Sequence, residues 1–284
     1  MFTLKNSELT IDVLDPITDR IHLGPRFCWG GYIWQVNDNK LGPLISGPEW
    51  PNPNPTPFNG QGLPESFRYK TRDDKFLTWN GFTGVSLGAG EIGLLKDGSC
   101  GVITPCVWNI THEECSMTFQ TRHILCGYDY EIIRKIELNN RTIRSTTTLV
   151  NYIENTLNLE WFAHPFFALK NKQTYAELPE GTTLAHNPGF DLIGTKLIQK
   201  RIFQSMTDGH LDYLNLPEEK THKVNLMHPI LSHVSLMFNF KPSECLIWGN
   251  NSTFSIEPYR VITLNPNESL TWTLEYNFGL TTSG

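Results

Sequence analysis

The sequence predicts an all-β protein built as a large antiparallel β-sandwich. Three observations lead to this prediction: many short runs rich in β-branched and aromatic residues, turn-forming residues between these runs, and very little helical periodicity. The C-terminal run SLTWTLEYNF is the clearest example. Its apolar side chains alternate with polar ones, at Leu270, Trp272, Leu274 and Tyr276. Such alternation is typical of a sheet with one buried face and one polar face.

Strand-like runs occur along the whole chain. In order they are GYIWQV, KFLTWNGF, CGVITPCVWNI, SMTFQTRHIL, YEIIRKIEL, RTIRSTTTLVNYI, LNLEWFAHPFFAL, HVSLMFNF, CLIWGN, STFSIE, RVITL and SLTWTLEYNF. The stretch TKLIQKRIFQSM fits either a short helix or a strand. No repeat of about 20–50 residues is visible, which argues against a propeller or a solenoid. We therefore expect one domain that spans residues 1–284.

Composition excludes several classes of function. The 284 residues carry 29 acidic and 23 basic side chains, a net charge of −6, so binding to nucleic acid or to an anionic membrane is not expected. No apolar run reaches the roughly 18 residues of a membrane span. The first residues, MFTLKNSELTIDVLDP, lack the apolar segment of a secretory signal. These features predict a cytoplasmic protein.

The six cysteines are expected to be free thiols. They are Cys28, Cys100, Cys106, Cys115, Cys126 and Cys245. None forms a CxxC pair, and a chain of this size can build a core without disulfides. Neither HExxH nor a 2-His-1-carboxylate spacing is present, so we expect no metal and no cofactor.

A proline-rich segment, PEWPNPNPTPFNGQGLPE, interrupts the early strands. It holds six prolines, so it is neither a helix interior nor a central strand. It fits either a flexible linker or an ordered loop. We expect an ordered loop over Pro48–Gly62 at the rim of a cleft, because Trp50, Phe58 and Leu63 offer apolar anchors.

Two ionisable residues stand out, because each interrupts an apolar run just before a proline. They are His164 before Pro165 and Glu257 before Pro258. Proline cannot donate to a strand ladder, so each position predicts a strand end or a bulge, where a sheet aims functional side chains into a cleft. Taken singly, each also fits a simpler role: a hydrogen-bonded structural histidine and a solvated glutamate.

Together with their surroundings, these residues resemble a known family. The segments that carry the resemblance are, in order, RFCWGGYIWQV, GQGLPESF, GAGEIGLLKDG, YDYEIIRKIEL, LVNYIENTLNLEWFAHPFF and IEPYRVITLNPNESLTWTLEYNFG. From Arg26 to Phe278 the chain resembles the aldose 1-epimerase (galactose mutarotase-like) superfamily, and in particular its divergent branches, which include glucose-6-phosphate 1-epimerase. The matching elements are Leu149 and Asn151, the run from His164, and Glu257. The resemblance implies a twisted supersandwich of β-sheets.

The resemblance also implies a reaction, the interconversion of the α and β anomers of an aldose or a sugar phosphate. Glu257 would be the base that takes the C1 hydroxyl proton, and His164 the acid that protonates the ring oxygen. Each such group typically contributes ~10²–10⁴-fold in rate. By analogy with other paired carboxyl sites, we expect the two side chains to lie roughly 5–9 Å apart in one cleft.

For substrate binding the resemblance points to Arg26, Arg68, Asp208 and Trp161. Arg72 is an alternative to Arg68, Asp212 an alternative to Asp208, and Trp29 and Trp34 are further aromatic candidates. Each also fits a structural role, since arginines pair on surfaces and aromatics of β-proteins mostly fill cores. The expected partner is a small carbohydrate, and the expected assembly is a monomer or a homodimer.

The chain departs from the family pattern at two points. The second histidine of the mutarotases, in an HG context, has no match, because His112 and His123 lack that context. Pro165 replaces the usual asparagine beside His164. These departures favour an alternative, a catalytically silent carbohydrate-binding or sensing protein on the same scaffold. A lyase or another isomerase is a third possibility, since one fold hosts several chemistries. A triad hydrolase is not expected, because no G-x-S-x-G elbow is present.

Overall fold

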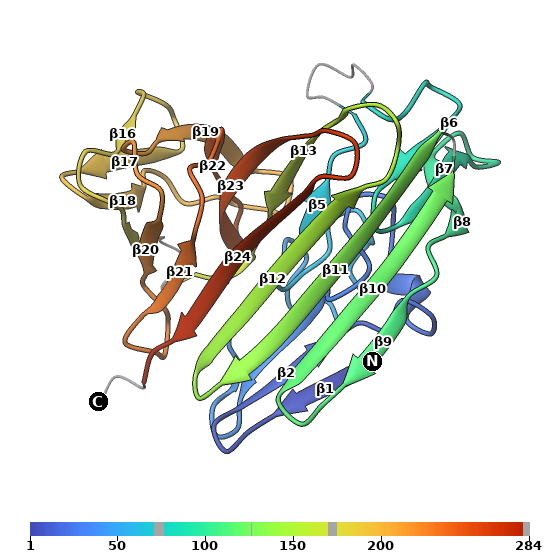
Figure 1. The fold of residues 1–284 in the computed structure, drawn as a ribbon. Coiled ribbons are helices and arrows are strands. Elements are labelled where there is room, and N and C mark those ends of the chain that lie inside the picture. The colour runs from blue at the N-terminus through green and yellow to red at the C-terminus, as the bar shows by residue number, and fades with distance from the viewer. Residues whose placement is uncertain (71–76, 126, 170–174, 281–284) are drawn as a thin grey trace.

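The structure is almost entirely β. The computed structural model describes residues 1–70, 77–125, 127–169 and 175–280. Within these ranges the strands form four antiparallel sheets, and the one helical element is a 3-10 turn, η1 (Arg20–His22) (Figure 1). None of the described helical residues forms a helix long and apolar enough to cross a membrane. The predicted all-β class is confirmed.

Two large sheets form the body of the molecule. The ten-stranded sheet has the order β17 (Phe190–Ile193), β18 (Lys196–Gln199), β15 (Tyr175–Glu177), β20 (His222–Leu226), β21 (Val234–Phe238), β24 (Ser269–Phe278), β12 (Thr142–Asn151), β11 (Tyr128–Asn139), β10 (Ser116–Leu125) and β9 (Asn109–His112). The seven-stranded sheet has the order β16 (Thr183–Leu184), β19 (His210–Asn215), β22 (Glu244–Gly249), β23 (Thr253–Leu264), β13 (Leu157–Ala163) and β5 (Glu65–Phe67), with β14 (Phe167–Ala168) also paired to β23.

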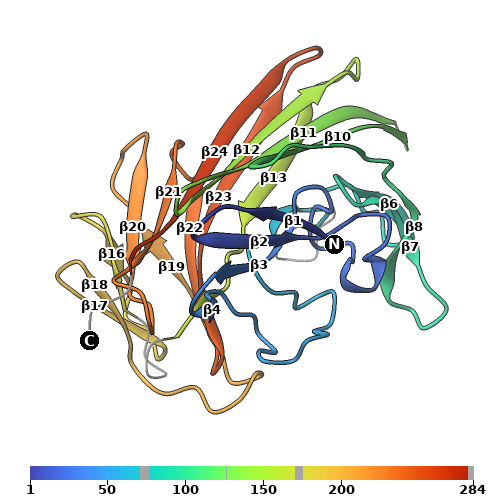
Figure 2. The same cartoon turned by 90° about the horizontal axis from the view of Figure 1, so that it is seen from below.

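Two smaller sheets complete the fold. The N-terminal sheet contains β1 (Phe2–Lys5), β2 (Leu9–Val13), β3 (Ile33–Asp38) and β4 (Gly42–Pro43). A three-stranded sheet contains β6 (Thr83–Ser86), β7 (Gly90–Leu94) and β8 (Cys100–Pro105). Figure 2 shows the long strands β10, β11, β12 and β24 curving over the N-terminal sheet. The N-terminal strands therefore lie on the concave side of the large sheet.

The core lies between the two large sheets, as the alternation in the last strand predicts. In β24 every second residue from Trp272 to Phe278 is buried, and its neighbours are partly exposed. The Trp272 ring meets Trp161 of the opposite sheet at 5.1 Å between ring centroids, in an edge-to-face arrangement that aromatic pairs prefer. Phe67 of β5 contacts the same indole at 6.2 Å. Aromatic side chains thus hold the two sheets together.

A buried ion pair crosses this core. Arg134 on β11 donates from Nη2 to Glu65 Oε1 on β5 at 2.5 Å, and the two side chains are only 1% and 2% exposed. The arginine also donates to the Gly30 carbonyl at 3.0 Å. The carboxylate accepts from the hydroxyls of Ser145 and Thr147 at 2.7 and 3.2 Å. These hydrogen bonds compensate for the water that both charges lose on burial.

The structure corrects one of the expected strands and decides the one segment that fitted either a helix or a strand. Residues 77–82 of KFLTWNGF form no strand, because the Asn80 side chain accepts hydrogen bonds from the backbone of Phe82 and Thr83 and so closes a turn. The ambiguous TKLIQKRIFQSM contains the strand β18, in which Leu197 and Gln199 are buried and their neighbours are more exposed. This period of two is typical of a strand and not of a helix.

The proline-rich segment is an ordered loop, as expected. The Glu49 carboxylate accepts hydrogen bonds from Asn52, from the backbone and hydroxyl of Thr56, and from Asn59. Leu63 is buried, whereas Phe58 is 66% exposed and is therefore no anchor to the core. One carboxylate near the start of the loop thus organises its interior.

The five cysteines in the described ranges are free thiols, as predicted. They are Cys28, Cys100, Cys106, Cys115 and Cys245. The sixth, Cys126, lies outside the described residues. Burial raises the pKa of the Cys106 thiol to about 12, so this group is protonated and unreactive at neutral pH.

Breaking the buried ion pair should strongly destabilise the protein. Arg134→Met alone leaves the Glu65 carboxylate buried without its partner, and we expect a loss of about 3–5 kcal/mol in the free energy of unfolding. Urea denaturation checks this through the transition midpoint at unchanged slope. Glu275→Gln is the control, because it breaks the exposed Arg144–Glu275 pair and should cost no more than about 1 kcal/mol. Equal, small losses in both variants would contradict the structural role of the buried pair.

Candidate active site

An interruption in the seven-stranded sheet brings His164 and Glu257 together. Strand β13 pairs with β23 as far as Phe162 opposite Tyr259, and pairing resumes only with β14, where Phe167 lies opposite Phe254. The residues between these pairs, 163–166 and 255–258, face each other across a break in the ladder. His164 Nε2 and Glu257 Oε1 meet in this break at 3.3 Å. Two residues far apart in the sequence thus form one pair.

The two prolines play different parts in this break. Pro165 lies inside it, as expected for a residue that cannot donate to a ladder. Pro258 does not end its strand, and β23 runs from Thr253 to Leu264 in regular register with β22, contrary to our expectation of a strand end or a bulge at Glu257. The Tyr259 carbonyl accepts from Ser243 on the β22 side, so the nitrogen of Pro258 faces β13, where pairing has already stopped. No ladder hydrogen bond is lost, and the strand continues.

Aromatic rings enclose the His164 imidazole. Phe166 lies at 4.4 Å and Trp248 at 5.8 Å between ring centroids, Phe27 packs edge-on, and the histidine side chain is 5% exposed. Burial holds the pKa of His164 well below its ordinary value, and the nearby charge of Arg26 lowers this pKa further. The imidazole is therefore neutral at pH 7.

Glu257 faces the same aromatic enclosure but has polar neighbours. Its side chain is 3% exposed, and the Tyr259 hydroxyl donates to Oε2 at 3.3 Å. Burial lowers the pKa of Arg26, and the Glu257 carboxylate opposes that shift. An arginine remains protonated in proteins, so a positive charge lies near this carboxylate.

The distance within the pair is shorter than the roughly 5–9 Å that we expected from carboxyl-pair sites. The observed 3.3 Å places the imidazole and the carboxylate side by side. Anomer interconversion suits such a spacing, because both reacting oxygens, the hydroxyl on C1 and the ring oxygen, are bonded to the same carbon.

A pocket of about 240 Å³ lies beside the pair. Phe162 and Tyr259, which line it, stack in parallel at 4.5 Å between ring centroids. Three cationic side chains also line it, Arg26, Arg68 and Lys70. Because Tyr259 also contacts Glu257, the pair adjoins this lining. The described side chains contain no group of three or more His, Cys, Asp or Glu that is arranged to hold a metal ion.

The proline-rich loop reaches the pocket through Phe58. Arg26 donates from Nη1 to the Phe58 carbonyl at 2.8 Å. Its guanidinium carbon lies 4.7 Å from the centre of the Phe58 ring and 4.9 Å from that of Phe27, a cation–π arrangement on both rings. The loop therefore lies at the rim of the pocket, as expected, and helps to fix Arg26.

Two of the four expected substrate-binding residues line the pocket. Arg26 does so beside the acid–base pair, and Arg68 does so while it forms an ion pair with Glu160 at 2.8 Å. Arg72, the alternative to Arg68, lies outside the described residues. The indole of Trp29 is buried and donates to the Gly24 carbonyl, so it has a structural role.

Trp161 and Asp208 lie elsewhere. Trp161 is fully buried in the core, because successive residues of a strand face opposite sides and its neighbour Phe162 faces the pocket. Asp208 forms a two-point ion pair with Arg201 in a loop and does not line the pocket. This placement corrects both expectations.

The other candidates also have different surroundings. Asp212 contacts His210 at 3.2 Å, and by strand alternation its side chain faces the side opposite to that of Leu211, which lines the pocket. Trp34 is buried and packs on His22 at 4.7 Å between ring centroids.

Sequence reasoning missed Phe162 and Tyr259. A signal was present, since each lies two residues from a member of the acid–base pair, Phe162 from His164 and Tyr259 from Glu257. In a strand, residues two apart share a face. This rule could have placed both rings at the site.

Comparison with solved structures identifies the fold. The chain is similar to a galactose mutarotase related enzyme from Lactobacillus acidophilus, with 15% identity, a TM-score of 0.63 and coverage of 99% of this chain and 98% of that chain. It is also similar to a galactose mutarotase-like protein from Lactobacillus casei, with 12% identity, a TM-score of 0.62 and coverage of 98% and 99%. A galactose mutarotase-like protein from Clostridium acetobutylicum has 11% identity, a TM-score of 0.56 and coverage of 96% and 93%.

These likenesses extend over nearly the full length of each chain. The sequence itself matches no protein-family model and none of the curated proteins. At such identities the comparison establishes the architecture: the protein has the galactose mutarotase-like β-sandwich fold, as the sequence resemblance implied. The chemistry must be argued from the site.

Replacing Arg26 should raise the pKa of His164. Arg26→Met removes the positive charge that disfavours the imidazolium, so the pKa should move up toward its ordinary value. It should stay below that value, because burial, the larger cause, remains. Titration of the labelled imidazole by NMR measures the shift. Arg68→Met is the matched control, since Arg68 lines the same pocket but pairs with Glu160. An unchanged or lower pKa in Arg26→Met would show that the arginine charge does not act on His164.

Proposed function

We propose that the protein is an aldose 1-epimerase that interconverts the α and β anomers of an aldose or a sugar phosphate. The observation that carries the proposal is the contact between His164 and Glu257 in a break of the strand ladder, beside a pocket lined by aromatic and cationic side chains. The galactose mutarotase-like fold supports it. Glu257 is the base and His164 the acid.

The reaction needs two proton transfers. Glu257 takes the proton of the C1 hydroxyl, and the ring oxygen receives a proton from His164 as the C1–O bond of the ring opens. Rotation about the bond between C1 and C2 and reclosure on the other face of the aldehyde reverse both transfers, which restores the pair. His164 must therefore be protonated when the ring opens. Because its pKa is low, we expect the rate to rise as pH falls below 7, until protonation of Glu257 removes the base.

The sugar must also reach the pair. With side chains only 5% and 3% exposed, His164 and Glu257 lie behind the stacked rings of Phe162 and Tyr259. Epimerisation therefore requires the stack to shift so that C1 replaces Tyr259 at Glu257. Exclusion of water from the site would then strengthen the interactions of both catalytic groups with the substrate.

The charge around the pocket would also accommodate an anionic sugar within the proposed class. Arg26, Arg68 and Lys70 line it, and no carboxylate occurs among the described residues that do so. Such a cluster attracts phosphate or carboxylate groups. We place the reaction in the cytoplasm, because the five described cysteines are free thiols. A monomer or homodimer is sufficient, since all residues of the proposed site come from one chain.

A second candidate is a carbohydrate-binding protein without catalysis. The near-complete burial of the acid–base pair favours it, because a closed pair can serve as a structural contact. The absence of the second mutarotase histidine points the same way. This protein would bind a sugar at the pocket and leave its anomers unchanged.

Glu257→Gln should lower the catalysed rate of anomer exchange by ~10²–10⁴-fold and leave sugar binding nearly intact. Glutamine keeps the shape but cannot take the hydroxyl proton. His164→Asn should lose a similar amount, and the double variant little more, because groups that act as one unit are not additive. NMR exchange measurements over common aldoses and their 6-phosphates, extrapolated to zero buffer, give the rates. Glu275→Gln, on the polar face of β24, is the control and should keep full activity.

Three results are informative. Exchange that survives Glu257→Gln unchanged would show that another residue is the base. Wild-type protein that shows no exchange for any aldose, yet melts at a higher temperature with one of them, would support the binding protein. Neither exchange nor stabilisation with any sugar would reject both functions.

A further inference from the structure

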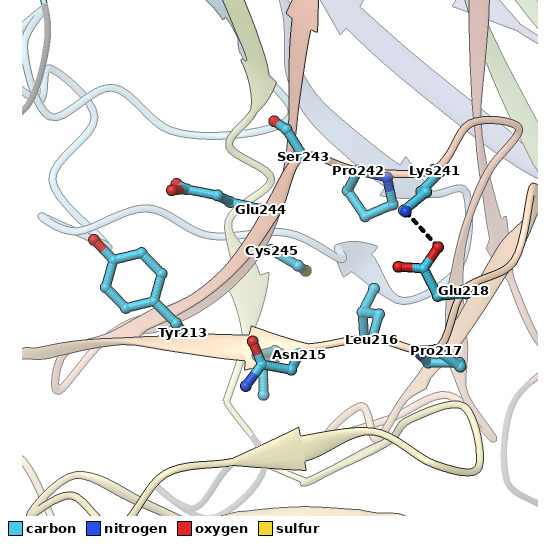
Figure 3. A pocket seen from close by; sticks show the side chains of 11 residues that line it. Tyr213, Asn215, Leu216, Pro217, Glu218, Lys241, Pro242, Ser243, Glu244 and Cys245 are labelled. Carbon is cyan, nitrogen blue, oxygen red and sulfur yellow. Dashed lines mark hydrogen bonds and ion pairs between the residues drawn. The ribbon is translucent and has the colours of Figure 1, made fainter.

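A larger pocket opens where two strands of the same sheet stop pairing. Strands β19 and β22 pair from His210 opposite Gly249 to Leu214 opposite Cys245, and the chain segments beyond that point diverge. A pocket of about 490 Å³ lies at this divergence, lined by residues 213–218 and 241–245. Figure 3 shows the Glu218–Lys241 ion pair on one side of this region and Tyr213 and Glu244 on the other.

This larger pocket is next to the candidate active site. Its lining residue Tyr213 is directly opposite Leu246, and its lining residue Glu244 is directly opposite Tyr259. Leu246 and Tyr259 both line the smaller pocket. Directly opposed residues of an antiparallel sheet share a face. In each of these two opposed pairs, one residue lines the larger pocket and the other lines the smaller one. The two pockets are therefore neighbours on the same face of the sheet.

The lining has the chemistry of a site for a polyhydroxylated, uncharged unit. The amide of Asn215, the hydroxyl of Ser243 and the carboxylate of Glu244 supply donors and acceptors for hydroxyl groups. Leu216 and Pro242 supply apolar surface for the C–H face of a ring. Two carboxylates and one ammonium nearly balance, which contrasts with the three cations of the smaller pocket.

We propose that the larger pocket is a second saccharide subsite, so that the substrate is a reducing oligosaccharide. The inference rests on the proposed epimerase function and specifies its substrate. Anomer exchange requires a free hydroxyl on C1, so the reducing-end unit occupies the smaller pocket beside Glu257. The next unit is joined through another hydroxyl of that ring and lies between Asn215 and Ser243. Contacts in the second subsite add affinity and leave the chemical step unchanged.

The experiment compares glucose with its reducing disaccharides maltose and cellobiose. We expect kcat/KM for anomer exchange to be at least about tenfold higher for one disaccharide than for glucose. Ser243→Tyr, which places a ring in the larger pocket, should abolish that advantage. Lys241→Met should reduce the advantage by removing the ion pair with Glu218. The matched controls are Ser269→Tyr and Lys223→Met, at exposed positions on the ten-stranded sheet.

Calorimetric titration with the same three sugars separates this inference from the proposed function. Tighter binding of a disaccharide that is lost in Ser243→Tyr supports the subsite, even if no anomer exchange is observed. Exchange of glucose with no gain for either disaccharide, and no effect of Ser243→Tyr, overturns the subsite and leaves the epimerase in place. Binding of none of the three sugars also overturns it. A melting temperature of Ser243→Tyr close to that of Ser269→Tyr shows that the variant is folded.

Discussion

The buried pair of Arg134 and Glu65 is the constraint on which the site depends. Two charges in a dry interior depend on their mutual contact and on the hydrogen bonds they form, so the strands that carry them have little freedom to shift. Glu65 lies opposite Ala163 at the end of β13, and the carbonyl of Pro64 accepts from the His164 backbone at 2.9 Å. The ion pair thus fixes the position of β5, and β5 in turn fixes the backbone of His164, just after the end of β13.

The candidate active site uses burial for a different purpose. Aromatic rings around His164 remove water and hold its imidazole neutral, while Arg26 places a positive charge near both members of the pair. Low polarity strengthens every charge interaction in the pair, but it also closes the pair to solvent. The burial that favours the proposed reaction therefore also hinders entry of the substrate. The stacked rings of Phe162 and Tyr259 lie between the pair and the pocket, so they are the side chains that must move to admit it.

The sequence predicted the fold and singled out His164 and Glu257, which the structure brings into contact, but it was less informative about the residues around them. Long alternating runs such as β24 follow from periodicity alone, and an ionisable residue before a proline marked both His164 and Glu257. Trp161 was misplaced because a shift of one residue in a strand reverses the face, which composition does not reveal. Asp208 was misplaced because its partner Arg201 lies in the same loop, and pairing within loops has no periodic signal.

The break between β13 and β14 divides the paired residues that set the strand register from the unpaired residues that belong to the candidate site. Register is set by the paired residues on both sides of the break and by the unbroken pairing of β23 with β22. Residues 163–166 form no ladder with β23, although the backbones of His164 and Phe166 still donate to the carbonyls of Pro64 and Gly62. The pairing with β23 therefore does not depend on the side chain at position 164, so one scaffold can retain or lose the His164–Glu257 contact while its architecture stays the same.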